Sequence, residues 1–169
     1  MKRTDFSSEL CSLAQTLNIV GEWWTWLIIR DIQLGVSTFG AIQTHLKISK
    51  KVLTDRLATL LEAEIIKAKE PGKPRSGYEL TAKGLELTPI MRLMIQWGDK
   101  WIYDNQGPVT FVHNSCGHEA RGTLVCDVCG EPMSSTDCTA HPNAELAQQW
   151  REYGLKVPEN GAKKSNTDN

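Results

Sequence analysis

The residues best suited to chemistry are a histidine and three cysteines, arranged in two closely spaced pairs late in the chain. Two residues separate His113 from Cys116 and Cys126 from Cys129, and a glycine follows each pair. This spacing lets a tight turn direct both ligand atoms at one ion, while the glycine relieves backbone crowding. One histidine and three cysteines would complete a tetrahedral zinc site without an open position, which predicts a structural site.

The pairs leave other interpretations open, because one His-x-x-Cys with one Cys-x-x-Cys is a weaker pattern than two Cys-x-x-Cys pairs. Cys138, His118 or His141 could replace any one ligand. Without metal the turns could carry free thiols, the cysteines could pair as disulfides on oxidation, or the segment could be disordered. The pattern resembles the paired knuckles of a zinc ribbon, so we expect zinc as the cofactor.

A capped amphipathic helix is predicted to begin after Ser49. The Ser49 hydroxyl can accept from the free N–H groups of the first helical turn. Apolar residues then recur at helical spacing and form one stripe, made of Leu53, Leu57, Leu60 and Leu61. Polar and basic residues lie on or near the opposite side, towards the N-terminal end: Lys50, Lys51, Thr54 and Arg56.

After this helix the pattern changes to that of two short strands joined by an exposed tip. Apolar and charged residues alternate over residues 66–69 and again over residues 78–80, and turn-forming prolines and glycines lie between them. Lys73 and Arg75 on this tip could reach a phosphate or the minor groove of a duplex. A helix beside a basic hairpin is the layout of a winged helix-turn-helix. In helix-turn-helix proteins the start of the second helix approaches base edges and phosphates. The expected DNA contacts are therefore Ser49, Lys50, Lys51, Thr54 and Arg56 on the helix, with Lys73 and Arg75 on the tip.

The charge distribution agrees with this arrangement. The chain has a formal net charge of −1, yet residues 47–83 carry +4 and the remainder carries −5. Such an asymmetry is typical of a face that binds nucleic acid. A solvated surface with random clustering of charge would give the same count, so charge alone leaves both interpretations open.

Two further helices are predicted to flank this region, and each has an apolar stripe. The first stripe comprises Leu10, Leu13, Ala14, Leu17 and Val20, and the second comprises Ile90, Met91, Met94, Trp97 and Trp101. Thr88 before Pro89 is a suitable start for the later helix. The stripes could cover the chain's own core. Packing against a second copy would also bury them, and we expect a homodimer with recognition helices about 34 Å apart.

In these features the sequence resembles the HxlR family of winged-helix transcriptional regulators. The matching segments, within residues 9–103, are Cys11 with Leu13, Val20–Trp24, Leu27–Asp31, Phe39-Gly40, Ile48–Thr54, Arg56-Leu57, Leu60, Tyr78–Thr81, Lys83-Gly84 and Trp97-Gly98. C-terminally extended members look similar around the cysteine pairs. The chain departs from the family at Ser12, where many members have proline, and at Ile65-Ile66.

The resemblance implies a mainly α (α+β) fold with a winged helix-turn-helix, flanking dimerisation helices and a small zinc-ribbon-like unit. It also implies a homodimer that binds double-stranded, pseudo-palindromic operator DNA and regulates transcription, and is not an enzyme. Some members sense oxidants or electrophiles through a cysteine at the position of Cys11, which makes this residue a candidate redox sensor. The alternative is a small buried apolar residue. A small-molecule effector is a further expectation.

Three parts are expected along the chain: residues 1–106 for DNA binding and dimerisation, 107–142 for the Cys/His unit, and 143–169 for a short helix and a mobile tail. The longest uncharged apolar stretch, Trp23–Ile29, is too short to span a bilayer. We therefore expect a cytoplasmic protein without a membrane partner. The alternative function is a winged-helix module that binds protein or RNA and has a structural zinc site.

Overall fold

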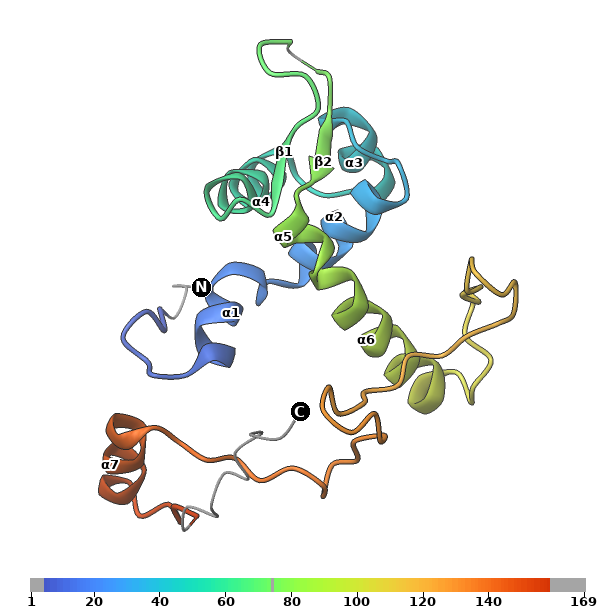
Figure 1. The fold of residues 1–169 in the computed structure, drawn as a ribbon. Helices are drawn as coiled ribbons and strands as arrows, with labels where there is room; N and C mark the ends of the chain where they lie inside the picture. The colour runs from blue at the N-terminus through green and yellow to red at the C-terminus, as the bar shows by residue number, and fades with distance from the viewer. Residues whose placement is uncertain (1–4, 74, 159–169) are drawn as a thin grey trace. The chain divides into compact units, whose positions relative to one another are not determined.

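The computed structural model describes residues 5–73 and 75–158. The chain divides into two compact units, Met1–Gly122 and Thr123–Asn169, and each is considered by itself. The first unit contains α1 (Ser12–Val20), α2 (Trp23–Gln33), α3 (Phe39–Leu46), α4 (Lys50–Glu62), β1 (Ile66–Ala68), β2 (Tyr78–Leu80), α5 (Ala82–Leu85) and α6 (Leu87–Ile102) (Figure 1). The second contains α7 (Ala144–Glu152). The predicted three-part division stays a prediction.

Three helices and a two-stranded antiparallel sheet enclose the core of the first unit. The fully buried side chains include Ile28 and Ile29 from α2, Ile42 from α3, and Leu53 from α4. The predicted fold class, mainly α with a winged helix-turn-helix, is confirmed. Leu61 is the exception within the predicted stripe: its side chain is 40% exposed, because it lies beside the buried face formed by Leu53, Leu57 and Leu60.

Polar caps fix where the helices of this core begin. The Thr38 hydroxyl accepts from Ala41 N at the start of α3, and the Ser49 hydroxyl accepts from Val52 N at the start of α4, both at 3.3 Å. Between these helices Lys47 adopts φ 51°, which ends α3 and turns the chain into α4. The predicted start and cap of α4 are therefore confirmed.

The predicted strands form a hairpin in which Ile66 pairs with Leu80 and Ala68 pairs with Tyr78. The base of this hairpin is attached to the core, since Tyr78 N donates to Ser37 O at 2.9 Å. After β2 the chain passes close to the end of α4. A Cβ on Gly84 would lie 2.1 Å from Ile65 O, so only glycine fits there. Pro74, one of the predicted turn residues, lies outside the described residues.

A fully buried carboxylate connects α2 to α3. Asp31 accepts from Arg30 Nη2 at 2.8 Å and lies 2.7 Å from His45 Nδ1. A buried charge is costly unless it is paired and hydrogen-bonded, and both partners come from the helices that Asp31 joins. The arrangement holds the first helix of the helix-turn-helix against α2.

The last helix of the first unit begins earlier than the sequence predicts. Its N-cap is Glu86, and α5 runs almost directly into it. Thr88 is therefore in the first turn, where its hydroxyl donates to Leu85 O at 2.9 Å, and it does not cap the helix. The prediction of a cap at Thr88 is wrong, because α6 already begins at Leu87, after its N-cap Glu86.

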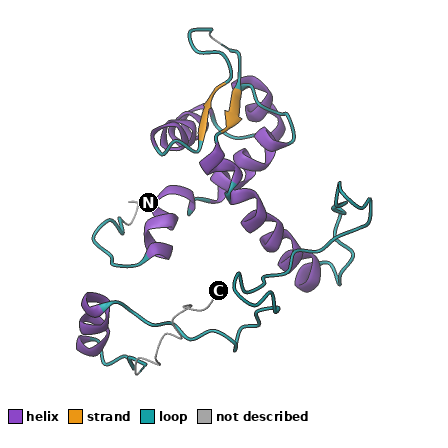
Figure 2. Ribbon diagram, in the orientation of Figure 1, coloured by secondary structure: helices purple, strands orange, loops and turns teal. Residues whose placement is uncertain are grey.

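Most of residues 103–143 are loop and turn (Figure 2). The predicted short C-terminal helix is confirmed as α7, which Asn143 caps by accepting from Leu146 N at 2.9 Å. The polar tail that was predicted to be mobile falls almost entirely on residues 159–169, outside the described part of the chain. Within the described residues, no helix has the length and apolarity needed to cross a bilayer.

Candidate nucleic-acid interface

The N-terminal end of α4 is exposed and basic. Ser49, Lys50, Lys51 and Thr54 are all exposed, while the apolar face of the same helix is buried. The Lys51 side chain is 86% exposed and its Nζ lies 3.4 Å from Asp55, one turn along the helix. Such a surface pair is weak and can exchange for a phosphate contact. Four of the five residues predicted for this helix end and its cap thus lie together on an accessible surface.

Arg56 is the residue of this set that the structure places differently. Its side chain is only 14% exposed, and its Nη1 lies 3.9 Å from Glu22 Oε1, at the start of α2. That nitrogen is buried without a hydrogen-bond partner among the described residues. The guanidinium is therefore directed back towards α2, away from the exposed surface that Lys50 and Lys51 occupy.

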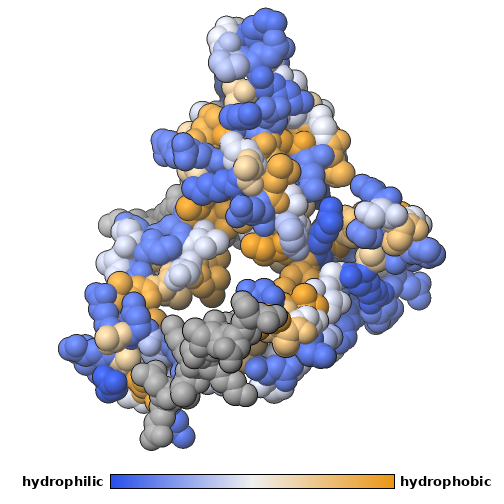
Figure 3. All heavy atoms as spheres, viewed as in Figure 1, coloured by the Kyte–Doolittle hydropathy of each residue, from blue (hydrophilic) through white to orange (hydrophobic). Residues whose placement is uncertain are grey.

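The hairpin contributes a second group of cations, and hydrophilic residues cover its tip (Figure 3). Some of these cations already have acidic partners. Lys67 Nζ lies 3.1 Å from Glu79, and Lys73 forms an ion pair with Glu70. Arg75, at φ 74°, is exposed and has no acidic partner within the described residues.

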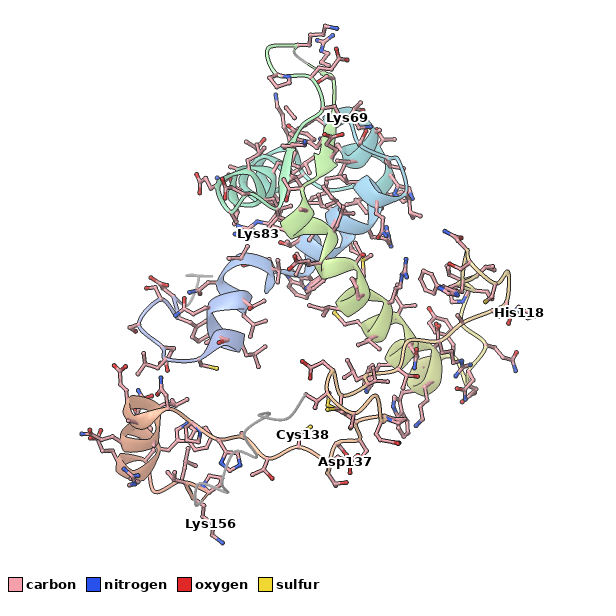
Figure 4. The ribbon with its side chains drawn as sticks, viewed as in Figure 1. Lys69, Lys83, His118, Asp137, Cys138 and Lys156 are labelled. Carbon is pink, nitrogen blue, oxygen red and sulfur yellow. The ribbon has the colours of Figure 1, made fainter. Side chains whose placement is uncertain are left out.

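Two further exposed lysines are adjacent in the chain to α4 and to the hairpin, although the sequence analysis did not nominate them. Lys47 is exposed in the turn between α3 and α4, and Lys69 is exposed where β1 leads into the hairpin (Figure 4). No ion pair is formed by either lysine in the described part of the chain. The local excess of positive charge was the available signal. Lys83, in contrast to Lys47 and Lys69, has a partner: its Nζ donates to Ala63 O at 2.8 Å and stabilises the end of α4.

The stripes on α1 and α6 are largely exposed in the single chain. Leu13 is 66% exposed, Met94 50%, Trp97 62% and Trp101 64%, whereas Val20 and Met91 are buried. Contiguous exposed apolar residues usually mark an interaction surface. The interpretation that both stripes cover the chain's own core is therefore wrong for most of their residues.

The first Cys/His pair lies in a short knuckle. Cys116 N and Gly117 N both donate to His113 O, at 3.2 and 2.8 Å, which directs the His113 and Cys116 side chains together. His113 Nδ1 lies 3.3 Å from Cys116 Sγ. Gly117 has φ 72°, so the glycine after the pair is required by the turn. The two ends of the knuckle are joined by His113 N donating to His118 O at 2.9 Å.

The second pair repeats this hydrogen bonding thirteen residues later, a local repeat that the sequence analysis missed. Gly130 N donates to Cys126 O at 2.8 Å, Cys126 N donates to Glu131 O at 2.9 Å, and Gly130 has φ 74°. Backbone hydrogen bonds from Cys129 and then Val128 lower the pKa of the Cys126 thiol. A lowered pKa favours the thiolate, the form that binds metal.

Each predicted ligand pair is therefore brought together, one in each compact unit. Among the residues described, no group of three or more His, Cys, Asp and Glu side chains gathers in one place to hold an ion. All five cysteines are free thiols. Of the alternative ligands, Cys138 lies against Met133, with 3.7 Å between the sulfurs, and His141 is exposed.

Cys11 is exposed and is the residue immediately before α1. The alternative that it is a buried apolar residue is therefore wrong for this chain. A reactive thiol must be exposed to solvent, and Cys11 meets this requirement. A redox role for Cys11 stays a prediction.

The chain is similar to known helix-turn-helix proteins. The uncharacterized HTH-type transcriptional regulator Rv3095 of Mycobacterium tuberculosis is 34% identical over 134 residues, covering 78% of this chain and 85% of that protein. Mb3122 of Mycobacterium bovis, which has the same description, matches to the same extent.

Two solved structures share the fold. PA1607, described as a candidate transcription factor, superposes with a TM-score of 0.71 at 27% identity, covering 81% of this chain and 98% of that one. The corresponding candidate factor PA1374 from Pseudomonas aeruginosa gives 0.56 at 28% identity, covering 85% of this chain and 99% of that one.

The family model described as HxlR-like helix-turn-helix matches residues 19–106, which include every helix and strand from α2 to α6. That region holds the buried core, the capped basic helix end and the hairpin described above. The predicted resemblance is thereby confirmed, and so is the expectation of a regulator and not an enzyme. The chain belongs to the HxlR-like helix-turn-helix family of transcriptional regulators.

Proposed function

We propose that this protein is a sequence-specific transcriptional regulator that binds a pseudo-palindromic operator as a homodimer. The observation that carries the proposal is the division of α4 into a buried apolar face and an exposed basic end. In helix-turn-helix proteins the start of the second helix approaches base edges and phosphates in the major groove. Lys50, Lys51 and Thr54 are the residues that would make these contacts.

The hairpin would contact the backbone beside this groove. Lys69 and Arg75 are the best candidates, because neither has an acidic partner within the described residues. Phosphate contacts of this kind position the protein and add affinity without reading sequence. Lys73 is a weaker candidate than the sequence suggested, since Glu70 already neutralises it.

The homodimer would be formed by α1 and α6. Their exposed stripes include large side chains, and burying them against the same helices of a second copy would remove a large apolar area from water.

We expect Met94→Glu to convert the dimer to a monomer in sedimentation velocity. The control Lys156→Glu should stay dimeric, because this exposed lysine belongs to neither α1 nor α6. A monomeric parent protein would contradict the proposed dimer.

We also propose that His113, Cys116, Cys126 and Cys129 bind one structural zinc ion. The knuckles support the two ligand pairs, because Gly117 N donates to His113 O and Gly130 N donates to Cys126 O in the same way. Zinc bound by four protein ligands supplies folding energy and no catalysis. Elemental analysis should find about one zinc per chain, and Cys126→Ser should lose it while Cys138→Ser keeps it. Absence of zinc in protein purified without chelator would refute the site.

DNA selection tests the regulatory function. The purified protein is mixed with a pool of random duplexes, and the retained fragments are sequenced. We expect a pseudo-palindrome with half-sites about one helical turn apart, about 34 Å. Retention of RNA in preference to duplex, or of duplexes without a shared sequence, would overturn the proposal.

A further inference from the structure

Arg56 lies on the recognition helix but is directed towards the junction between α1 and α2. Its partner, Glu22, is the N-cap residue of α2, and the two side chains are 14% and 36% exposed. Arg56 Nη1 is buried and lacks a hydrogen-bond partner in the described residues, and it forms an ion pair with Glu22 Oε1 at 3.9 Å. A partly desolvated guanidinium of this kind depends on its carboxylate.

The junction that holds Glu22 is tightly constrained. Gly21 follows the last residue of α1, and its N–H donates to Leu17 O at 2.8 Å. A Cβ on Gly21 would lie 2.4 Å from that oxygen, so no larger residue fits. The turn from α1 into α2 therefore requires glycine at position 21. The next residue, Glu22, lies 3.9 Å from Arg56 on the recognition helix.

We infer that Arg56 is a positioning residue, which sets the recognition helix relative to the dimerisation helix α1 through Glu22. This inference rests on the proposed function. In a dimer that binds two half-sites, the separation of the recognition helices depends on how each α4 is held relative to the dimer interface. Loss of the contact lowers affinity and relaxes the preference for half-site spacing, while the preferred bases stay the same.

The experiment measures binding of the full-length protein to its selected duplex and to duplexes with the half-sites moved by one base pair. The variants are Arg56→Ala, Glu22→Ala, the double variant, and the exchange E22R/R56E. Glu62→Ala, on an exposed position of α4, is the matched control. Urea unfolding of each protein provides a readout that does not depend on DNA.

We expect each single alanine variant to weaken binding to the natural spacing by roughly 3- to 30-fold, as is usual for coupled ion-pair residues. The double variant should be no weaker than either single one, and the exchange should recover most of the loss. Neither single variant should change the bases selected.

Three results would overturn the inference. A changed base preference in Arg56→Ala alone would show that Arg56 reads DNA directly. A normal Glu22→Ala protein beside a defective Arg56→Ala protein would show that the pair is not coupled. The inference would also be excluded if the losses of DNA affinity and of unfolding free energy in the double variant equalled the sums of the losses in the two single variants. If the parent protein selects no DNA sequence, the proposed function itself is wrong. If the parent selects an operator but one of the three results above is found, only the inference about Arg56 is wrong.

Discussion

Replacing Lys69 with alanine should change how DNA binding depends on salt. Each phosphate that a protein neutralises on B-DNA contributes about 0.9 to the slope of log affinity against log salt concentration. The proposed homodimer would present Lys69 twice, so the variant should have a slope shallower by about 1.8. Between 50 and 200 mM salt, the ratio of parent to variant affinity should then fall about 12-fold.

The assay is fluorescence anisotropy with a labelled selected duplex at four or more salt concentrations. The control is E70A/K73A, which removes an ion-paired lysine and its partner together and leaves the net charge unchanged. We expect the slope of this double variant to match that of the parent. The reasoning is refuted if Lys69→Ala keeps the parent slope, or if the charge-neutral control changes it equally.

Three further outcomes concern stability and metal. Ser49→Ala removes the cap of α4 and should lower the free energy of unfolding in urea by about 1 kcal/mol; an unchanged value would show that the cap is not needed. Gly84→Ala places a Cβ against Ile65 O and should cost about 1–3 kcal/mol, whereas Gly40→Ala, which meets open space, should not destabilise. Chelation of zinc should accelerate hydrogen exchange around Cys129; protection that survives metal removal would argue against a zinc-dependent fold.

Local sequence signals predicted the parts of the interface that depend on local chemistry. Ser49 was identified as a cap because a hydroxyl before an apolar-periodic run can accept from the free N–H groups of the first turn. The structure confirms this bond, from Val52 N. The hairpin strands were predicted from the alternation of apolar and charged residues, which indicates directly which face of a strand is buried. These features need only a few neighbouring residues.

Features that depend on how helices pack could not be predicted in the same way. Arg56 and Leu61 were assigned from helical spacing. In the structure Arg56 is covered beside Glu22 at the start of α2, whereas Leu61 is left exposed at the edge of the buried face. The contact between Asp31 and His45 joins residues far apart in sequence, and neither has a local pattern that reveals it. Thr88 likewise lies inside α6 because α5 ends at Leu85 and α6 begins at Leu87, with only Glu86 between them.

The repeated knuckles show a second kind of feature that could not be predicted from the sequence. The two ligand pairs were recognised from their spacing, but the thirteen-residue offset of their hydrogen bonds was not, because few of the flanking residue types are the same. Backbone geometry repeats there without sequence repeating. A comparison of turn residues alone, with Gly117 and Gly130 at matching positions, would have indicated it.

Methylation footprinting of the selected duplex tests the central claim most directly, since dimethyl sulfate reports guanine N7 in the major groove and adenine N3 in the minor groove. We predict protection of guanine N7 in two half-sites one turn apart, lost at those positions when Lys50 and Lys51 are replaced by alanine. Protection confined to the minor groove, or major-groove protection that persists in the K50A/K51A protein, would contradict insertion of the basic end of α4.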